Sequence, residues 1–321
     1  MVVTGIGQCS WDFLALVDSY PPVDSKREVL QWEEQGGGPV ATALVALSRL
    51  GVDCRFLGVV GDDVLGEKIR ASLVAEGIDC RGVLTRTGST SQRAFIVVEA
   101  GSASRTIFWQ RPTGEPLAPA ELADDYLEDS RFLLLDGLMA DVSLAAALDA
   151  RQRGIPVMLD AGRLRPGMME LARLCDYVVA GEQYAFDLGW DGSEQTFPVF
   201  ARSVGAPVVT VTGGTRGSLT WSGSNAIHQP AFPVTAVDST GAGDVFHGGY
   251  LFGLLQGWGF PAVLSFAAAL AALKCTRLGG RNGIPGFPQV MDFLRERGVP
   301  MPHSDGRSKG SAGEKSPLEV L

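Results

Sequence analysis

The sequence predicts an α/β fold in which helices cover both faces of a mainly parallel sheet. Short, β-branched apolar runs of strand length alternate along the chain with longer amphipathic or Ala/Leu-rich runs of helix length. The strand-length runs are apolar throughout, which is typical of strands buried on both faces. With 321 residues, 45% hydrophobic and 20% charged, the chain is long enough for one large domain of this class.

The elements are expected in alternating order along the chain. The first predicted helix begins at Pro39, which suits a first helical turn, and ends before Gly51, which suits a helix end. Gly77 ends the second in the same way. Strands are expected at residues 2–7, 54–60, 132–135, 157–160, 177–180 and 208–212, and helices at residues 39–50, 64–75 and 142–153.

Two stretches, residues 12–32 and 91–109, break this alternation. Their apolar residues recur loosely at every second position, as in the run 95–99, and a turn is expected at residues 100–102. We expect extra antiparallel strands outside the main sheet that form a flap over a site, and an ordinary surface hairpin is the alternative. The domain is predicted to span residues 1–303, with these flap segments at about 12–33 and 91–112. The Ser-, Gly-, Lys- and Glu-rich tail, residues 304–321, is predicted to be disordered.

Charge, hydropathy and metal-binding residue types exclude several classes of protein. Lys and Arg number 27 against 36 Asp and Glu, a net charge of −9, so a general nucleic-acid binder is not expected. The apolar run 262–273, which Lys274 ends, is too short to span a bilayer, and residues 1–5 show no signal-peptide pattern. Five cysteines without C-x-x-C spacing indicate free thiols in a reducing cytoplasm, and three histidines make a His-rich zinc site untenable.

The strongest chemical signal is the segment 237–249, VDSTGAGDVFHGG, which precedes an apolar helix expected to end near Leu255. The N–H groups of Gly241, Ala242 and Gly243 would then lie unpaired at a helix N-terminus, where the helix dipole favours an anion such as a phosphoryl group in transfer. Asp244, one residue further on, could accept a proton from an attacking hydroxyl. The alternative is that Asp244 merely stabilises the helix start.

This segment resembles the D-T-T-G-A-G-D-x-F motif of the PfkB (ribokinase-like) carbohydrate kinases, with Ser239 the only change in its core. Residues 36–43 resemble the family's Gly-Gly signature before a helix, and residues 59–66 its next block. The resemblance runs from about residue 2 to 298. It implies a three-layer α/β/α sandwich with a mainly parallel central sheet and a small β-strand lid. It also implies an ATP-dependent sugar kinase that transfers the γ-phosphoryl group of Mg-ATP to a primary hydroxyl of a monosaccharide or sugar derivative.

The resemblance also implies roles for individual residues. Asp244 matches the catalytic base, and Gly241, Ala242 and Gly243 match the anion hole. Asp12 matches an aspartate that binds sugar hydroxyls, although a turn residue is the alternative, and Gly37 and Gly38 would let the sugar approach the backbone. The ATP-binding T-x-G-x-x-G pattern falls on Thr212, Gly214 and Gly217, where a Gly-Gly hairpin is the plain alternative.

The sequence departs from the family pattern at two motifs. Thr42 stands where the family has Asn. The N-x-x-E motif that organises the magnesium water shell falls on residues 181–184, where only Glu182 offers a carboxylate, and we expect it to act through water. The family resemblance further implies a monovalent cation such as K⁺ and a homodimer formed through the lid.

Residues 271–281 and 284–285 look like the sulfofructose kinase branch of the family, whose substrate is anionic. The lid segments carry Lys26, Arg93, Arg105 and Arg111, which would suit a sulfonate or phosphate, although solvated surface charges are the alternative. Leu138 and Met139 supply no basic group where that branch would carry one. The sequence therefore leaves the sugar, and whether it is anionic, open.

Two rival functions remain. Residues 5–10 begin a dinucleotide-binding fingerprint, but Ser10 replaces its third Gly, which disfavours an NAD-dependent dehydrogenase. The altered motif at residues 181–184 leaves a catalytically idle sugar- or nucleotide-binding member of the same fold as the alternative to a kinase.

Overall fold

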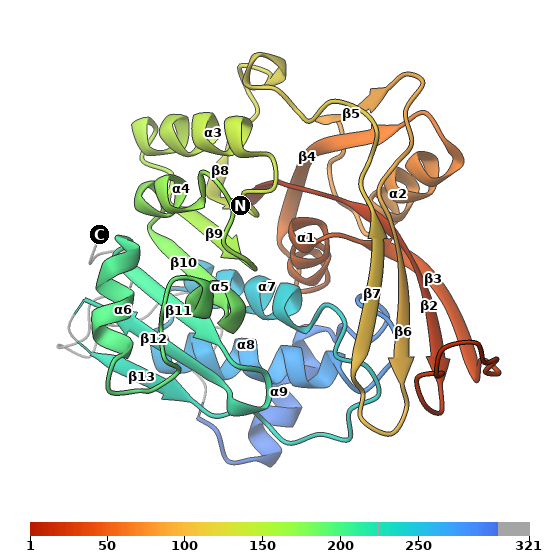
Figure 1. Cartoon of the computed structure of the whole chain (residues 1–321). Helices are drawn as coiled ribbons and strands as arrows, with labels where there is room; N and C mark the ends of the chain where they lie inside the picture. The colour runs from red at the N-terminus through yellow and green to blue at the C-terminus, as the bar shows by residue number, and fades with distance from the viewer. Residues whose placement is uncertain (224, 301–321) are drawn as a thin grey trace.

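The computed structural model describes residues 1–223 and 225–300, and it confirms the predicted α/β fold (Figure 1). Within these residues the main sheet has nine strands. In spatial order they are β13 (Ala226–Gln229), β12 (Ser218–Ser222), β11 (Val208–Thr212), β10 (Tyr177–Gly181), β9 (Val157–Ala161), β8 (Ser130–Leu135), β1 (Val2–Ile6), β4 (Asp53–Gly61) and β5 (Val83–Arg86). The strands from β11 to β5 are parallel, and β12 and β13 continue the sheet antiparallel. The carboxyl ends of the parallel strands therefore meet at one edge.

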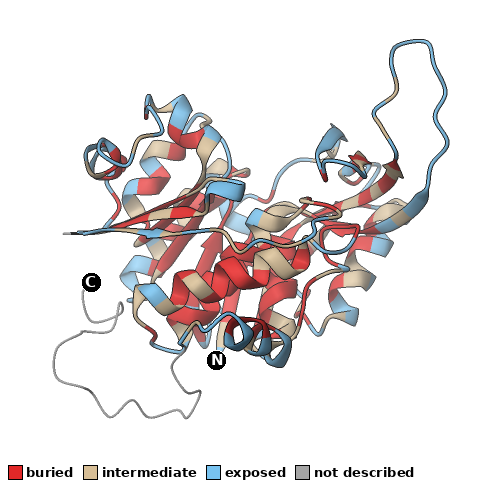
Figure 2. Ribbon diagram, turned by 90° about the horizontal axis from the view of Figure 1, so that it is seen from below, coloured by how far each residue is buried: buried red, intermediate tan, exposed pale blue. Residues whose placement is uncertain are grey.

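Helices cover both faces of this sheet. One face packs against α1 (Pro39–Arg49), α2 (Val64–Ala75), α7 (Ala242–Leu255), α8 (Phe260–Lys274) and α9 (Phe287–Glu296). The other packs against α3 (Ala140–Gln152), α4 (Met168–Leu174), α5 (Glu182–Asp187) and α6 (Phe197–Val204). Two short 3₁₀ turns, η1 (Pro119–Glu121) and η2 (Gly214–Arg216), lie in the connections. Each face has its own apolar core, and Figure 2 shows the buried residues gathered on the strands and the inner sides of the helices.

α7 packs closely against α1 and α8 because two glycines of α7 face these helices. A Cβ on Gly248 would lie 2.8 Å from the carbonyl oxygen of Ala43 on α1, and one on Gly249 would lie 2.9 Å from the Cα of Ala267 on α8. Larger residues at these positions would force the helices apart. The middle of α7 is thereby fixed between two neighbouring helices.

The two flap segments form a separate sheet, the small sheet, in the order β3 (Gln31–Gly37), β2 (Ser10–Val17), β6 (Arg93–Glu99) and β7 (Arg105–Gln110). The expected antiparallel pairing is confirmed within each hairpin but does not hold at the centre of the small sheet, where β2 and β6 run parallel. Each belongs to its own antiparallel hairpin, β2 with β3 and β6 with β7, and the two hairpins lie side by side. Leu14, Ile96 and Val98 on its inner face pack against Leu278.

The cysteines, the apolar helices and the C-terminal tail were the subject of three further predictions. The five cysteines are free, and Cys275 alone among them is only partly buried. Among residues 1–223 and 225–300, no helix combines the length and the apolar character that crossing a membrane requires. The tail predicted at residues 304–321 lies outside the described residues.

Candidate active site at the carboxyl ends of the strands

The turn before α7 is held by the fully buried carboxylate of Asp238. One of its oxygens accepts the N–H of Thr240 and the other accepts the N–H of Gly279, both at 2.7 Å. Gly241 then adopts a left-handed conformation with φ 72°, and a Cβ there would lie 2.9 Å from the Cα of Gly280. Only glycine satisfies both demands, so the turn depends on residue 241.

The N-terminus of α7 differs in one respect from the sequence expectation. The N–H of Ala242 is not free, because it donates to the carbonyl oxygen of Ser239 at 3.2 Å. This bond closes the tight turn that the small residues make possible. Within the described residues no backbone acceptor is recorded for the N–H groups of Gly241 and Gly243, which leaves these two to meet an anion.

Asp244 lies in the first turn of α7 and is partly buried. Burial raises the pKa of its carboxyl to about 7, the charge of Asp160 raises it as well, and His247 and Arg105 oppose the rise. A carboxyl with a pKa near neutrality is suited to accept a proton in the physiological range.

One turn further along α7, His247 ties the helix to the sheet. Its Nδ1 lies 2.6 Å from the carbonyl oxygen of Gly243, and its Nε2 lies 3.0 Å from that of Val179 and 3.5 Å from Oδ1 of Asp160. Burial lowers the pKa of this imidazole. The contacts hold the Gly243 peptide in place and connect it to β9 and β10.

Asp160 is a site residue that the sequence interpretation missed. It lies in β9 near its carboxyl end, is 6% exposed, and its Oδ2 has no hydrogen-bond partner among the described residues. Burial raises its pKa to about 8, and the charge of Asp136 adds to this. The available signal was an aspartate at the end of a buried parallel strand, where ligands of α/β sheets bind.

The small sheet brings Asp12 to the same region. Asp12 is buried, and the Ser10 hydroxyl donates to it at 2.7 Å. Burial raises its pKa, and the Ser10 hydrogen bond and the charge of Arg281 oppose this. A Cβ on Gly37 would lie 2.0 Å from an oxygen of Asp12, so the carboxylate needs the bare backbone there. Gly38 has φ 97°, and a Cβ on it would lie 2.3 Å from the carbonyl oxygen of Gln8.

Arg281 is a second residue whose place in the site the sequence did not indicate. It is 4% exposed, and burial lowers its pKa to about 10. Its guanidinium donates to the carbonyl oxygen of Gly37 at 3.0 Å and contacts the hydroxyl of Thr42 at 3.4 Å. Thr42 is therefore engaged by Arg281, and the cation beside Asp12 comes from the main domain, not from the flap.

The four basic residues named as anion-binding candidates in the flap segments do not gather at one place. Arg105 donates to the hydroxyl of Ser239 at 2.8 Å and lowers the pKa of Asp244, so it lies at the site. Arg93 is exposed and donates to Gln110 at 2.8 Å, and Lys26 is exposed between β2 and β3. Arg111 lies over the ring of Trp109, 5.2 Å from its centroid. Arg93 and Lys26 therefore remain predictions as substrate-binding residues, and Arg105 is the one of the four with a contact at the turn before α7.

The predicted nucleotide segment forms the turn from β11 to β12. Thr212 donates to the carbonyl oxygen of Ala180 at 3.2 Å, and η2 contains Gly214. Gly217 has φ 86°, and a Cβ there would lie 2.0 Å from the carbonyl oxygen of Gln229. The glycine pattern thus makes a compact hairpin whose backbone lies near the carboxyl end of β11.

Glu182 lies beside this turn, at the start of α5, but its carboxylate is paired with the guanidinium of Arg216. A carboxylate neutralised in this way is a poorer acceptor for magnesium-bound water than a free one. Among the residues that the structure describes, no group of three or more His, Cys, Asp or Glu side chains could hold a metal by itself. Oδ2 of Asp160, which has no hydrogen-bond partner among the described residues, is a second oxygen available for that role once the carboxyl is ionised.

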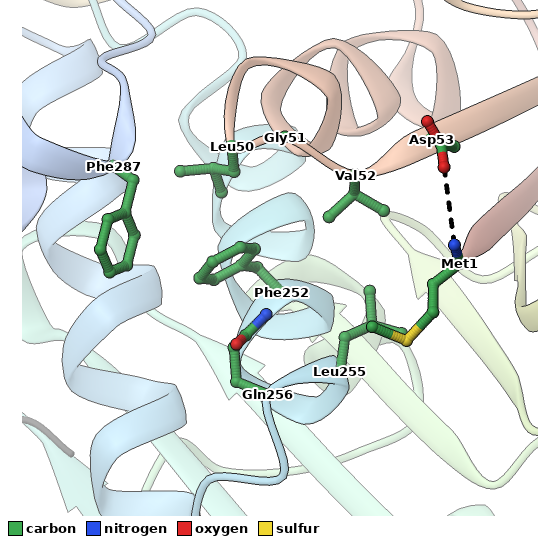
Figure 3. A pocket seen from close by; sticks show the side chains of 9 residues that line it. All are labelled: Met1, Leu50, Gly51, Val52, Asp53, Phe252, Leu255, Gln256 and Phe287. Atoms are coloured by element: carbon green, nitrogen blue, oxygen red, sulfur yellow. Dashed lines mark ion pairs between the residues drawn. The ribbon is translucent and has the colours of Figure 1, made fainter. Parts of the chain in front are cut away.

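Two hollows lie away from this site. One, of about 370 Å³, lies between the starts of β1 and β4 and the C-terminal end of α7, where Met1 and Asp53 form an ion pair at 3.5 Å and Phe252 and Phe287 face the hollow (Figure 3). The other, of about 490 Å³, lies along β6 and β7 between Arg93, Phe108 and neighbouring side chains. Neither hollow is lined by Asp244.

Comparisons with known proteins identify relatives of this chain in sequence and in fold. The model of the pfkB family carbohydrate kinases matches residues 3–286. The chain is 28% identical to the ATP-dependent ribose-1-phosphate kinase of Halopiger xanaduensis, covering 92% of this chain and 98% of that protein. It is 27% identical to the ribokinase of Bacillus subtilis, covering 90% and 98%. The crystal structure of ribokinase from Thermotoga maritima superimposes with a TM-score of 0.76 at 27% identity, covering 92% of this chain and 99% of that one.

Proposed function

Because this chain belongs to the pfkB family of carbohydrate kinases, phosphotransferases with an alcohol group as acceptor, we propose that it transfers the γ-phosphoryl group of Mg-ATP to a primary hydroxyl of a monosaccharide or sugar derivative. The observation that carries the proposal is the position of Asp244, a carboxyl with a pKa near 7 in the first turn of α7, next to the N–H groups of Gly241 and Gly243. A base and an anion-binding helix start are the two groups that phosphoryl transfer to a hydroxyl requires.

In this mechanism Asp244 accepts the proton of the attacking hydroxyl. The sugar oxygen forms a bond to the γ-phosphorus while the bond between that phosphorus and the β–γ bridging oxygen breaks, and ADP leaves with the bond electrons. The N–H groups of Gly241 and Gly243 stabilise the charge on the phosphoryl oxygens, and Ala242 joins them if its bond to Ser239 opens.

Mg²⁺, when bound with ATP, supplies Lewis-acid stabilisation of the phosphate charge. We assign the water around it to Asp160 in preference to Glu182, because Asp160 Oδ2 lacks a partner in the described residues and Glu182 is paired with Arg216. The turn with Thr212, Gly214 and Gly217 lies at the same edge of the sheet and is our candidate for nucleotide contact.

On the sugar side, Asp12 accepts two neighbouring hydroxyls of the substrate. The bare backbone at Gly37 and Gly38 leaves room for the sugar ring, and Arg281 keeps the Gly37 peptide in place. Arg105 is the flap cation that lies at the site, so an anionic group on the sugar would be met there.

We further assign the small sheet as a lid that closes over the sugar, and its outer face as the contact of a homodimer. Trp32, Phe95 and Phe108 are each more than two fifths exposed, and the rings of Trp32 and Phe95 lie 5.5 Å apart. An exposed aromatic patch of this kind is typical of a protein interface. Sedimentation of the wild type and of Trp32→Glu tests it, since the charged variant should be monomeric.

ADP release from Mg-ATP tests the kinase proposal. The panel contains ribose, fructose, ribose 1-phosphate, fructose 6-phosphate and sulfofructose, each assayed beside Asp244→Asn. Turnover confined to the anionic sugars would place Arg105 in contact with substrate and favour the sulfofructose branch, and turnover with neutral sugars alone would assign recognition to Asp12. No turnover with any sugar, while ATP still binds, would favour the catalytically idle alternative.

A further inference from the structure

Lys274, the last residue of α8, is fully buried although it carries an ammonium group. Its Nζ donates to the carbonyl oxygen of Asp238 at 2.9 Å and to that of Thr240. Within the described part of the chain it has no ion pair, because both oxygens of the Asp238 carboxylate accept backbone N–H groups instead. Burying an ammonium without a carboxylate contact is costly, so the carbonyl contacts must offset that cost.

The ammonium meets the kind of ligands that an alkali cation takes. Backbone carbonyl oxygens converging on one point replace the hydration shell of K⁺ in proteins. Here two carbonyls from one turn, separated by a single residue, converge on Nζ of Lys274. The nearby charges of Asp238 and Asp244 favour the protonated amine, although burial lowers its pKa overall.

These contacts bear directly on the anion hole because of peptide geometry. The C=O and N–H of a trans peptide point in opposite directions. When the Thr240 carbonyl points at Lys274, the N–H of Gly241 must point away from it, out of the turn. The described residues offer no backbone acceptor for that N–H. Lys274 therefore fixes the direction of a donor that faces the phosphoryl group.

The end of α8 is itself anchored to the same turn. The carbonyl oxygen of Cys275 accepts the N–H of Val237 at 2.8 Å and that of Asp238 at 3.1 Å. Cys275 follows Lys274 directly. The end of α8 therefore contacts the turn through the backbone of Cys275 and through the side chain of Lys274.

We propose that Lys274 is a tethered monovalent cation that orients the anion hole, so that the enzyme needs no added K⁺. This rests on the proposed kinase function and corrects one expectation drawn from the family resemblance. A free monovalent cation does not fit at the carbonyls of Asp238 and Thr240, because the ammonium already occupies the point on which they converge. Lys274 is a positioning residue, since it acts through the Gly241 peptide and touches neither substrate.

The test compares the wild type, Lys274→Ala and Lys274→Met in buffers whose cation is either tetramethylammonium or K⁺. We expect wild-type kcat to be equal in both. Lys274→Ala should lose about 10²-fold in kcat in tetramethylammonium, the scale for one anion-hole donor, and regain at least about tenfold with K⁺ or methylammonium. Lys274→Met fills the space without charge and should not recover. Lys68→Ala, at an exposed lysine on α2, is the matched control that should behave as wild type.

Several outcomes would overturn the inference. One is wild-type kcat that rises several-fold with K⁺, and another is a folded Lys274→Ala that K⁺ does not rescue. Thermal unfolding supplies a readout that needs no turnover: K⁺ should raise the midpoint of Lys274→Ala and leave that of the wild type unchanged. If the wild type phosphorylates no sugar, the kinase proposal fails, and the unfolding midpoints still decide whether the ammonium takes the place of a cation. If Lys274→Ala does not fold, the cation independence of the wild type decides alone.

Discussion

The pH dependence of turnover should report the ionisation of Asp244. Only the ionised carboxylate can accept the proton of the attacking hydroxyl, and burial places its pKa at about 7. The value of kcat/KM should therefore rise about tenfold per pH unit up to pH 7 and then level off. At pH 5, about two units below the pKa, about one hundredth of the plateau rate should remain. An exposed aspartate, with a pKa of about 4, would give a flat profile over this range.

The assay is coupled ADP release with the best sugar of the panel at saturating Mg-ATP. Asp244→Asn keeps the shape of the side chain and removes the base, so we expect a loss of about 10²–10⁴-fold across the whole pH range. Asp141→Asn is the matched control, because Asp141 also lies in the first turn of a helix but is exposed and belongs to α3. Its profile should equal that of the wild type.

Ionisation of ATP itself could produce a limb in the same range, since a phosphate has a second pKa of about 6. Arg105→Met separates the two sources. The charge of Arg105 lowers the pKa of Asp244, so its removal should move the limb to higher pH, whereas the ionisation of ATP would stay where it is. A flat wild-type profile, an unmoved limb in Arg105→Met, or undiminished turnover by Asp244→Asn would each refute the reasoning.

Three further predictions concern sugar binding and the effect of the buried Asp160 on thermal stability. Asp12→Asn should raise KM for the sugar about 10–100-fold, the scale of hydrogen bonds to a charged group, with KM for ATP unchanged; equal rises in both would contradict its assignment. Gly37→Ala should likewise raise KM for the sugar and leave KM for ATP unchanged, because the new Cβ would lie 2.0 Å from an oxygen of Asp12. Gly101→Ala is the control, since a Cβ there has open space around it and should change neither KM. Asp160→Asn should unfold at a higher temperature than the wild type at pH 8. The pKa of about 8 that Asp160 has in the folded protein lies above its ordinary value of 3.8. The stability that Asp160 contributes is therefore complete below pH 4 and is lost as the pH rises to 8; parallel melting profiles from pH 5 to 8 would contradict this.

The sequence predicts the fold well where an element has a clear period or clear ends. Residues 64–75 and 208–212 are helix and strand over the predicted bounds, and the other predicted elements agree to within about two residues. Two longer helices, α8 and α9, were not predicted although each begins with a Pro in its first turn. Elements without such signals were missed as well. β5 has four residues at the sheet edge, and α5 has six residues, too few to show a helical period. β12 and β13 follow the Gly-rich turn and carry a mixed burial pattern.

At the site, the sequence identifies residues whose role is carried by their immediate neighbours. Asp244 and Gly241 belong to one short turn, and the local spacing alone places a carboxyl beside a helix N-terminus. Arg281 and Lys274 were missed because their partners lie far along the chain, at Gly37 and at the turn 238–240. Lys274 entered the sequence interpretation as the residue that ends an apolar run and as part of the stretch 271–281 that resembles the sulfofructose kinase branch. Nothing local shows that its ammonium bonds two carbonyls.

The three cations of the site differ in what they can do. Lys274 and Arg281 give hydrogen bonds to backbone carbonyls of the turn and of Gly37, so within the described structure they supply a fixed positive field more than contacts to a ligand. Arg105 belongs to β7 of the small sheet and reaches the site through one bond to Ser239 at 2.8 Å. An opening of the small sheet that breaks this bond would carry away a charge that lowers the pKa of Asp244. Closure over the sugar would then both exclude water and favour the ionised base, which links the start of catalysis to the presence of substrate.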